Sequence, residues 1–85
     1  MNTFLLAISS PDGDVFREKV RFLSLRGAEG DLAVMAGHIP FVTTVKPCEV
    51  KIILEDDSEK IGKTDGGILT VGSDMVTLLS GSFTF

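Results

Sequence analysis

The chain has 85 residues, enough for one domain, and a hydrophobic content of 44%, enough for one core. The single cysteine, Cys48, excludes an internal disulfide and any zinc site built from several cysteines. The net charge is −4 and the eight basic residues are scattered among twelve acidic ones, whereas a nucleic-acid-binding surface needs clustered basic residues.

The N-terminal part predicts β-structure without a targeting segment. Residues 3–9 (TFLLAIS) form the first predicted strand, and the turn SPDGD ends it. The apolar stretch here is too short for a signal peptide, and no basic residues precede it. No run of about 18 apolar residues occurs anywhere, so we expect the chain to reach a membrane only through partner proteins. Residues 18–25 predict a second strand, with Val20 and Phe22 on one face.

The rest of the chain continues as short strands separated by turns. No stretch of ten or more residues shows a helical period, and Gly, Pro or acidic turns recur throughout. The further predicted strands are residues 31–35, 41–45, 49–54, 59–64, 66–71 and 75–80, with residues 82–85 as a candidate edge strand. The sequence therefore predicts one domain over residues 1–85, an all-β, two-sheet antiparallel β-sandwich of about ten short strands without a helical domain.

No catalytic motif is present. The chain lacks the phosphate-binding P-loop pattern, H-E-x-x-H, C-x-x-C and G-x-S-x-G. A small cysteine enzyme would require Cys48 and His38 to lie within hydrogen-bond reach of each other. The acidic run 55–59 lacks calcium-loop spacing and indicates a hairpin turn, so we expect neither a metal nor a cofactor.

His38, the only histidine, has two competing interpretations. It is either a loop residue whose ring binds a nearby carbonyl, or part of a surface that contacts a partner. A metal ligand or general base is disfavoured because no second histidine or third ligand accompanies it. The glycine pair Gly66–Gly67 predicts a bend or bulge at a sheet corner.

Three stretches together resemble one family. These are SPDGDVF (residues 10–16), EGDLAVMAGHIPFVTTVKP (residues 29–47) and GGILTVGSDMVTLLSG (residues 66–81). In this order they are similar to the epsilon subunit of F-type ATP synthases, which is called delta in mitochondria. The resemblance implies a β-sandwich of two sheets, in agreement with the strand pattern.

The resemblance also implies a function. It implies a non-catalytic subunit of the central stalk, or rotor, that binds the gamma subunit and the c-ring. Such a subunit couples ion-driven rotation to ATP synthesis and has no nucleotide site in this part of the chain. It would lie at the cytoplasmic face of a bacterial cell membrane, held there by the complex.

The resemblance assigns residues to two contacts. Those implied for the c-ring are Glu29, Gly30 and Asp31, and those implied for gamma are His38, Ile39, Phe41, Val42 and Thr43.

The sequence departs from the family at three positions. Ala33 stands where Gly is common, Phe41 replaces a usual Leu, and Cys48 stands where Gly commonly follows the proline, which puts a positive-φ turn there in doubt. Family members continue into a pair of C-terminal helices, and the sequence leaves open whether the gene ends at Phe85. It leaves the coupling ion open too.

The alternative function is a free-standing β-sandwich that binds a peptide or small ligand along an exposed edge strand.

Overall fold

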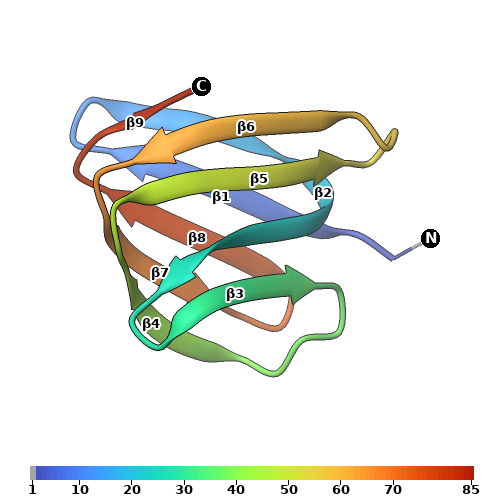
Figure 1. Ribbon diagram of the computed structural model, residues 1–85. Coiled ribbons are helices and arrows are strands. Elements are labelled where there is room, and N and C mark those ends of the chain that lie inside the picture. Colours follow the sequence, from blue (N-terminus) through green and yellow to red (C-terminus); the bar gives the residue numbers. More distant parts are fainter. Residues whose placement is uncertain (1) are drawn as a thin grey trace.

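The computed structural model describes residues 2–85 as nine β-strands arranged in two packed layers, and this part of the chain contains no helix (Figure 1). The strands are β1 (Phe4–Ser10), β2 (Gly13–Gly27), β3 (Gly30–Met35), β4 (Phe41–Val45), β5 (Cys48–Leu54), β6 (Glu59–Thr64), β7 (Gly67–Val71), β8 (Met75–Ser80) and β9 (Phe83–Thr84). One layer has the order β4–β7–β8–β1 and ends on the first half of β2. The other has the order β3, second half of β2, β5, β6 and β9.

Strand β2 belongs to both layers. Its first half pairs with β1, while its second half pairs with β5 on one edge and β3 on the other. The pairing of β2 with β5 has a bulge between Val20 and Phe22. At this point β2 ends its pairing with β1 and begins its pairing with β3. The predicted strand over residues 18–25 was therefore too short. Its missing first part is residues 13–17, where residues 13–14 fall in the predicted turn and the exposed charged run 17–19 interrupts the alternation.

The core lies between the two layers and consists of alternate side chains from nearly every strand. The largest fully buried side chains are Leu6, Ile8, Leu23, Ile52, Leu69 and Leu78. Burial of each such side chain contributes roughly 1.5–3 kcal/mol relative to exposure. The period of two that predicted the strands thus also identifies which residues form the core.

The predicted β-sandwich is confirmed, with one correction. The described residues form nine strands, in agreement with about ten, but one pair is parallel instead of antiparallel. A parallel pair needs a long connection, and residues 11–74 between β1 and β8 provide one. The candidate edge strand is confirmed as β9, which pairs with β6 and buries Phe83.

The glycine pair forms the predicted corner, between β6 and β7. A side chain at Gly67 would place its Cβ 1.9 Å from the Leu79 carbonyl oxygen, so only glycine allows β7 to lie this close to β8. Beside the corner, the buried hydroxyls of Thr64 and Ser80 share a hydrogen bond of 2.6 Å. The Asp65 carboxylate accepts the Ser82 backbone N–H at 2.9 Å, which ties the turn before β9 to the same corner.

Candidate docking surfaces

The β2–β3 hairpin ends in an acidic tip, defined here as Glu29, Gly30 and Asp31. Gly30 has a φ of +123°, a conformation that a residue with a side chain rarely adopts, and it pairs with Gly27 at the start of β3. The Ala28 N–H donates to the Thr44 carbonyl at 3.1 Å, and this bond fastens the turn to the opposite layer. The tip therefore projects from a fixed base, with both carboxylates exposed.

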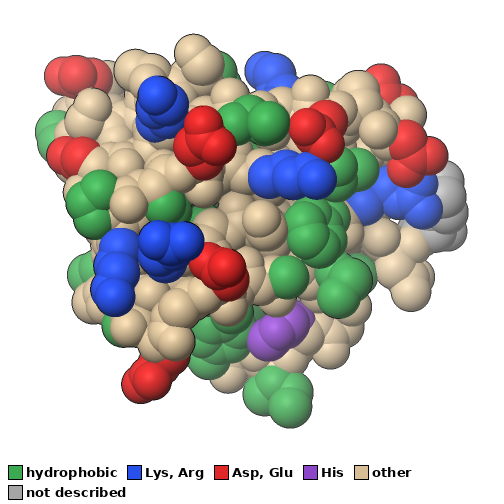
Figure 2. Space-filling model, viewed as in Figure 1, with side chains coloured by type: hydrophobic (Ala, Val, Ile, Leu, Met, Phe, Trp, Pro, Cys, Tyr) green, Lys and Arg blue, Asp and Glu red, His purple; other side chains and the backbone are tan. Residues whose placement is uncertain are grey.

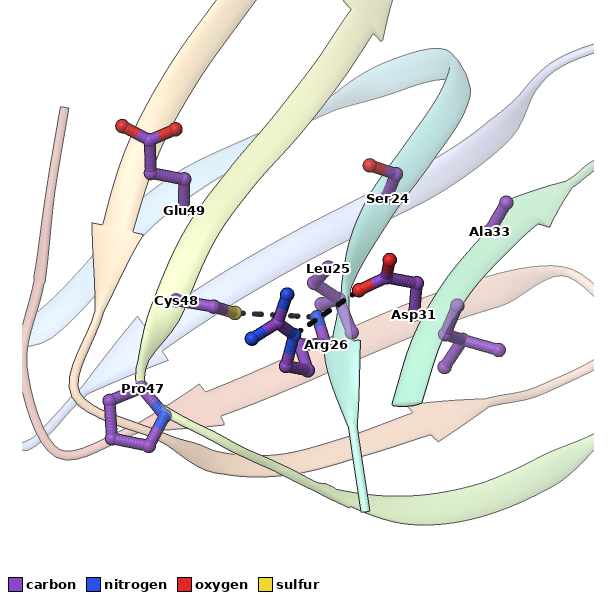
Figure 3. Close-up of a pocket in the computed structure, with 9 residues that line it drawn as sticks. Ser24, Leu25, Arg26, Asp31, Ala33, Pro47, Cys48 and Glu49 are labelled. Atoms are coloured by element: carbon purple, nitrogen blue, oxygen red, sulfur yellow. Dashed lines mark hydrogen bonds and ion pairs between the residues drawn. The ribbon is translucent and has the colours of Figure 1, made fainter. Parts of the chain in front are cut away.

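Arg26 lies directly opposite Asp31 and binds it (Figure 3). The Arg26 Nε–H donates to Asp31 Oδ1 at 3.2 Å, while the Arg26 backbone N–H donates to the Cys48 sulfur at 3.3 Å. These residues line an open hollow of about 530 Å³ between β3 and β5, and the Glu49 carboxylate at its margin points away from Arg26. Cys48 is half-buried at the start of β5 and does not have a positive φ, so the doubt about a positive-φ turn there was justified.

The loop between β3 and β4 carries the single histidine. The His38 backbone N–H donates to the Met35 carbonyl at 3.2 Å, and its ring Nδ1–H donates to the Ile39 carbonyl at 3.0 Å. The ring also lies 5.0 Å from that of Phe41, measured between centroids. The carbonyl-bound interpretation of His38 is therefore confirmed. Ile39, at 79% exposed, is the most exposed large hydrophobic side chain described.

The residues that the resemblance assigned to gamma do not share one face. Val42 points outward from β4 and is 66% exposed. Phe41 packs partly against the core, and Thr43 lies on the same side of the strand, next to Gly27. The loop that carries His38 and Ile39 lies at the opposite end of β3 from the acidic tip, whereas Thr43 lies next to Gly27 at the base of the tip (Figure 1).

The outer side of the β4–β7–β8–β1 layer is an uncharged face that the sequence reasoning missed. Its members lie side by side in the strand register and are Leu5, Val42, Thr44, Ile68, Thr70, Met75, Thr77 and Leu79, while Ala7 on the same side of β1 is buried. Ile68 and Leu79 are directly opposite each other and are 46% and 53% exposed. The basic residues Arg17 and Lys19 of β2 border it, opposite Ala7 and Leu5. One signal was available in the sequence: Asp74 is the only charged residue between Gly66 and Ser82, so neither face of this hairpin is charged.

The outer side of the other layer differs in character. Figure 2 shows acidic and basic side chains interspersed with hydrophobic ones over this face, with the histidine near its lower margin. Exposed ion pairs cross it, including Lys51 with Glu59 at 3.4 Å and Arg21 with Asp57. Mixed charges of this kind are typical of a solvated surface.

The described residues provide no support for an enzyme site. A cysteine enzyme would need the His38 ring and the Cys48 thiol to bind each other, but the two groups have separate partners. The His38 ring binds the Ile39 carbonyl, and the Cys48 sulfur accepts the Arg26 N–H. The acidic run forms the predicted turn between β5 and β6, where the Ser58 hydroxyl and backbone N–H donate to Asp56 and hold the pKa of that carboxyl below its usual range. Within residues 2–85, no three metal-binding side chains gather, and no helix could cross a membrane.

Comparison with known proteins gives one consistent result. The model of the family "ATP synthase, Delta/Epsilon chain, beta-sandwich domain" matches residues 3–85. The ATP synthase epsilon chain of Delftia acidovorans is 38% identical over 80 residues, which cover 94% of this chain and 58% of that relative. This chain thus spans a little over half the length of the relative.

Two solved structures share the fold. A chain of the Euglena gracilis mitochondrial ATP synthase, in a structure of OSCP, F1 and c-ring, has a TM-score of 0.92 at 21% identity over 99% of this chain and 54% of its own. A chain of the Tetrahymena thermophila mitochondrial ATP synthase central stalk and c-ring has a TM-score of 0.79 at 12% identity, over 95% of this chain and 65% of its own. With the family model covering nearly every residue, the chain belongs to the family of ATP synthase delta/epsilon chain β-sandwich domains.

Proposed function

We propose that this chain is a non-catalytic part of the central stalk of an F-type ATP synthase, where it joins the gamma subunit to the c-ring. The observation that carries the proposal is the uncharged face. A layer whose outer side has no charged residue over four neighbouring strands is unusual for a solvated surface and typical of the centre of a protein interface. We assign this face to gamma.

The second contact is the acidic tip, which we assign to the c-ring. It lies at the end of β3 away from the His38 loop, and its carboxylates are exposed on a fixed turn. One small rigid domain can bind two partners only if it offers two separate surfaces. The uncharged face and the exposed carboxylates of the acidic tip meet that condition, and Ile39, in the loop before β4, extends the gamma contact beyond Val42.

The role in the complex follows from these two contacts. A domain that holds gamma to the ring transmits ion-driven rotation and needs no nucleophile, base or cofactor of its own. It is held at the membrane by the c-ring, and the similarity to a bacterial epsilon chain favours the cytoplasmic face of a bacterial cell membrane.

The uncharged face can be tested with one substitution and a matched control. Leu79→Lys puts a charge at the centre of the face, and we expect it to weaken binding of the cognate gamma subunit by at least about tenfold, because a lysine must be desolvated there. Ile61→Lys introduces the same change at a similarly exposed position, 49%, on the other layer, and should bind like wild type. Binding is measured by titration of purified gamma. No binding of folded wild-type protein at micromolar concentration would overturn the proposal.

A peptide-binding module is the second candidate. Strand β3 pairs only with β2 among the described strands, so its other edge presents backbone groups to which an extended peptide could add. If the domain is a peptide-binding module, Leu79→Lys and Ile61→Lys would leave binding of the peptide unchanged, while substitutions at the edge of β3 would abolish it.

A further inference from the structure

We propose that Arg26 sets the charge that the acidic tip offers to its partner and holds Asp31 in position there. The inference rests on the proposed contact between the tip and the c-ring. It adds a residue that neither the sequence motifs nor the comparisons assign, and it defines the chemistry of the partner surface as one of hydrogen-bond donors and positive charges.

The backbone of Arg26 is held on both sides. Its N–H donates to the Cys48 sulfur at 3.3 Å, and its carbonyl accepts the Lys46 N–H at 2.9 Å. Strands β2 and β5 no longer pair at this point, because their register ends at Ser24 and Lys51. The thiol therefore takes the place of a backbone acceptor. As a result the guanidinium group starts from a fixed position beside the tip.

The side chain of Arg26 is directed at one carboxylate. Asp31 is its cross-strand neighbour, and the Nε–Oδ1 distance is 3.2 Å. Figure 3 shows both side chains turned toward each other over the hollow, with Glu49 pointing away. Glu29 lies at the turn itself and is exposed. Of the two acids in the tip, Asp31 is thus paired with a cation of its own chain, Arg26.

The ion pair of Arg26 with Asp31 changes the charge of the acidic tip more than it changes the stability of the fold. Both side chains are largely exposed, and exposed ion pairs contribute little to folding. With Arg26 counted, the tip carries one positive and two negative groups, a net charge of −1, and without Arg26 it carries −2. A partner that presents positive charges or N–H groups must compete with the guanidinium for Asp31, and it is also repelled by it. Arg26 therefore weakens the contact and keeps it reversible.

The experiment measures binding of fluorescently labelled protein to membranes that contain the cognate ATP synthase stripped of this subunit. Arg26→Gln should bind about two- to fivefold more tightly than wild type at low salt, and the gain should vanish near 0.5 M salt, where charges are screened. Arg26→Lys keeps the charge and should bind within about twofold of wild type. Lys51→Gln is the matched control, because it also removes a cation from an exposed ion pair on the same layer, and it should behave like wild type.

The outcomes separate the two proposals. If wild type binds and Arg26→Gln binds equally or more weakly, with its melting temperature unchanged, the role of Arg26 is overturned, while the c-ring contact is tested separately by weaker binding of Asp31→Lys to the same membranes. If wild-type protein does not bind the stripped membranes, the proposed contact and the role of Arg26 both fail. Equal gains from Arg26→Gln and Lys51→Gln would show an effect of net charge alone and would also overturn the inference.

Discussion

The Cys48 thiol replaces a backbone hydrogen-bond acceptor at the point where two strands separate. Where β2 and β5 separate, the Arg26 N–H would lose its acceptor, and the thiol of Cys48 supplies one at 3.3 Å. Sulfur is a weak hydrogen-bond acceptor, and here it is the acceptor that the Arg26 N–H has. The residue that departs from the family pattern thus has a structural explanation without any redox or catalytic role.

Replacement of Cys48 by alanine should destabilise the domain slightly. We expect Cys48→Ala to lower the free energy of unfolding by about 1 kcal/mol, because the Arg26 N–H loses its partner. Exchange of the Arg26 amide hydrogen should accelerate in the same variant, as measured by NMR. Cys48→Ser keeps an acceptor and should lose less stability. An unchanged exchange rate in Cys48→Ala would show that the hydrogen bond is not formed in solution.

At the scale of the elements, the corner between β6 and β7 determines how closely the strands pack. Backbone oxygens crowd this corner. A Cβ atom added to Gly66 would lie 2.8 Å from the Val45 oxygen, and one added to Gly67 would lie 1.9 Å from the Leu79 oxygen. The buried Thr64–Ser80 bond and the Asp65–Ser82 bond join this corner to the turn before β9. Three chain segments are therefore fixed at one point.

The corner predicts a large difference between two glycine substitutions. Gly67→Ala should cost more than about 3 kcal/mol, because the methyl group collides with a backbone carbonyl and β7 must separate from β8. Gly27→Ala should cost less than about 1 kcal/mol, since its nearest neighbour would be at an ordinary 3.5 Å. Urea unfolding of both variants provides the measurement. A Gly67→Ala protein as stable as Gly27→Ala would contradict the strand spacing described here.

The strands were predictable from the sequence to the extent that they alternate. Strands such as β5 have one buried and one solvated face, so residues 49–54 reveal both the strand and its orientation. The first half of β2 and the parallel pairing of β1 with β8 were not predictable, because each depends on which distant strand lies alongside. The acidic tip was identified from its motif, whereas the uncharged face needed the register of four strands before its residues came together.

For the whole molecule, the main feature is the separation of the two proposed contacts. The acidic tip belongs to the β2–β3 hairpin of one layer, and the uncharged face is the outer side of the other layer. The two surfaces approach each other at β4, where the Thr44 carbonyl accepts the Ala28 N–H, but Asp31 and Leu79 lie on strands of different layers that do not pair. Residues that do not contact each other and share no partner have additive effects. The two contacts should therefore be separable by mutation.

We expect Asp31→Lys and Leu79→Lys to affect different partners. Asp31→Lys should weaken binding to c-ring-containing membranes and uncouple ATP hydrolysis from ion pumping, while purified gamma binds as before. Leu79→Lys should weaken gamma binding in solution. Both proteins should fold normally, because both positions are exposed. If Asp31→Lys left coupling unchanged in the assembled enzyme, the acidic tip would have to be removed from the proposed c-ring contact.

The passage of β2 through both layers has a mechanical consequence. Its 15 residues run from the border of the uncharged face, at Arg17 and Lys19, to the base of the acidic tip, at Gly27. A load applied between those two surfaces is thus carried along one continuous backbone, flanked by β1, β3 and β5. A load applied along β2 would act on these hydrogen bonds in shear, so that many of them would have to break together.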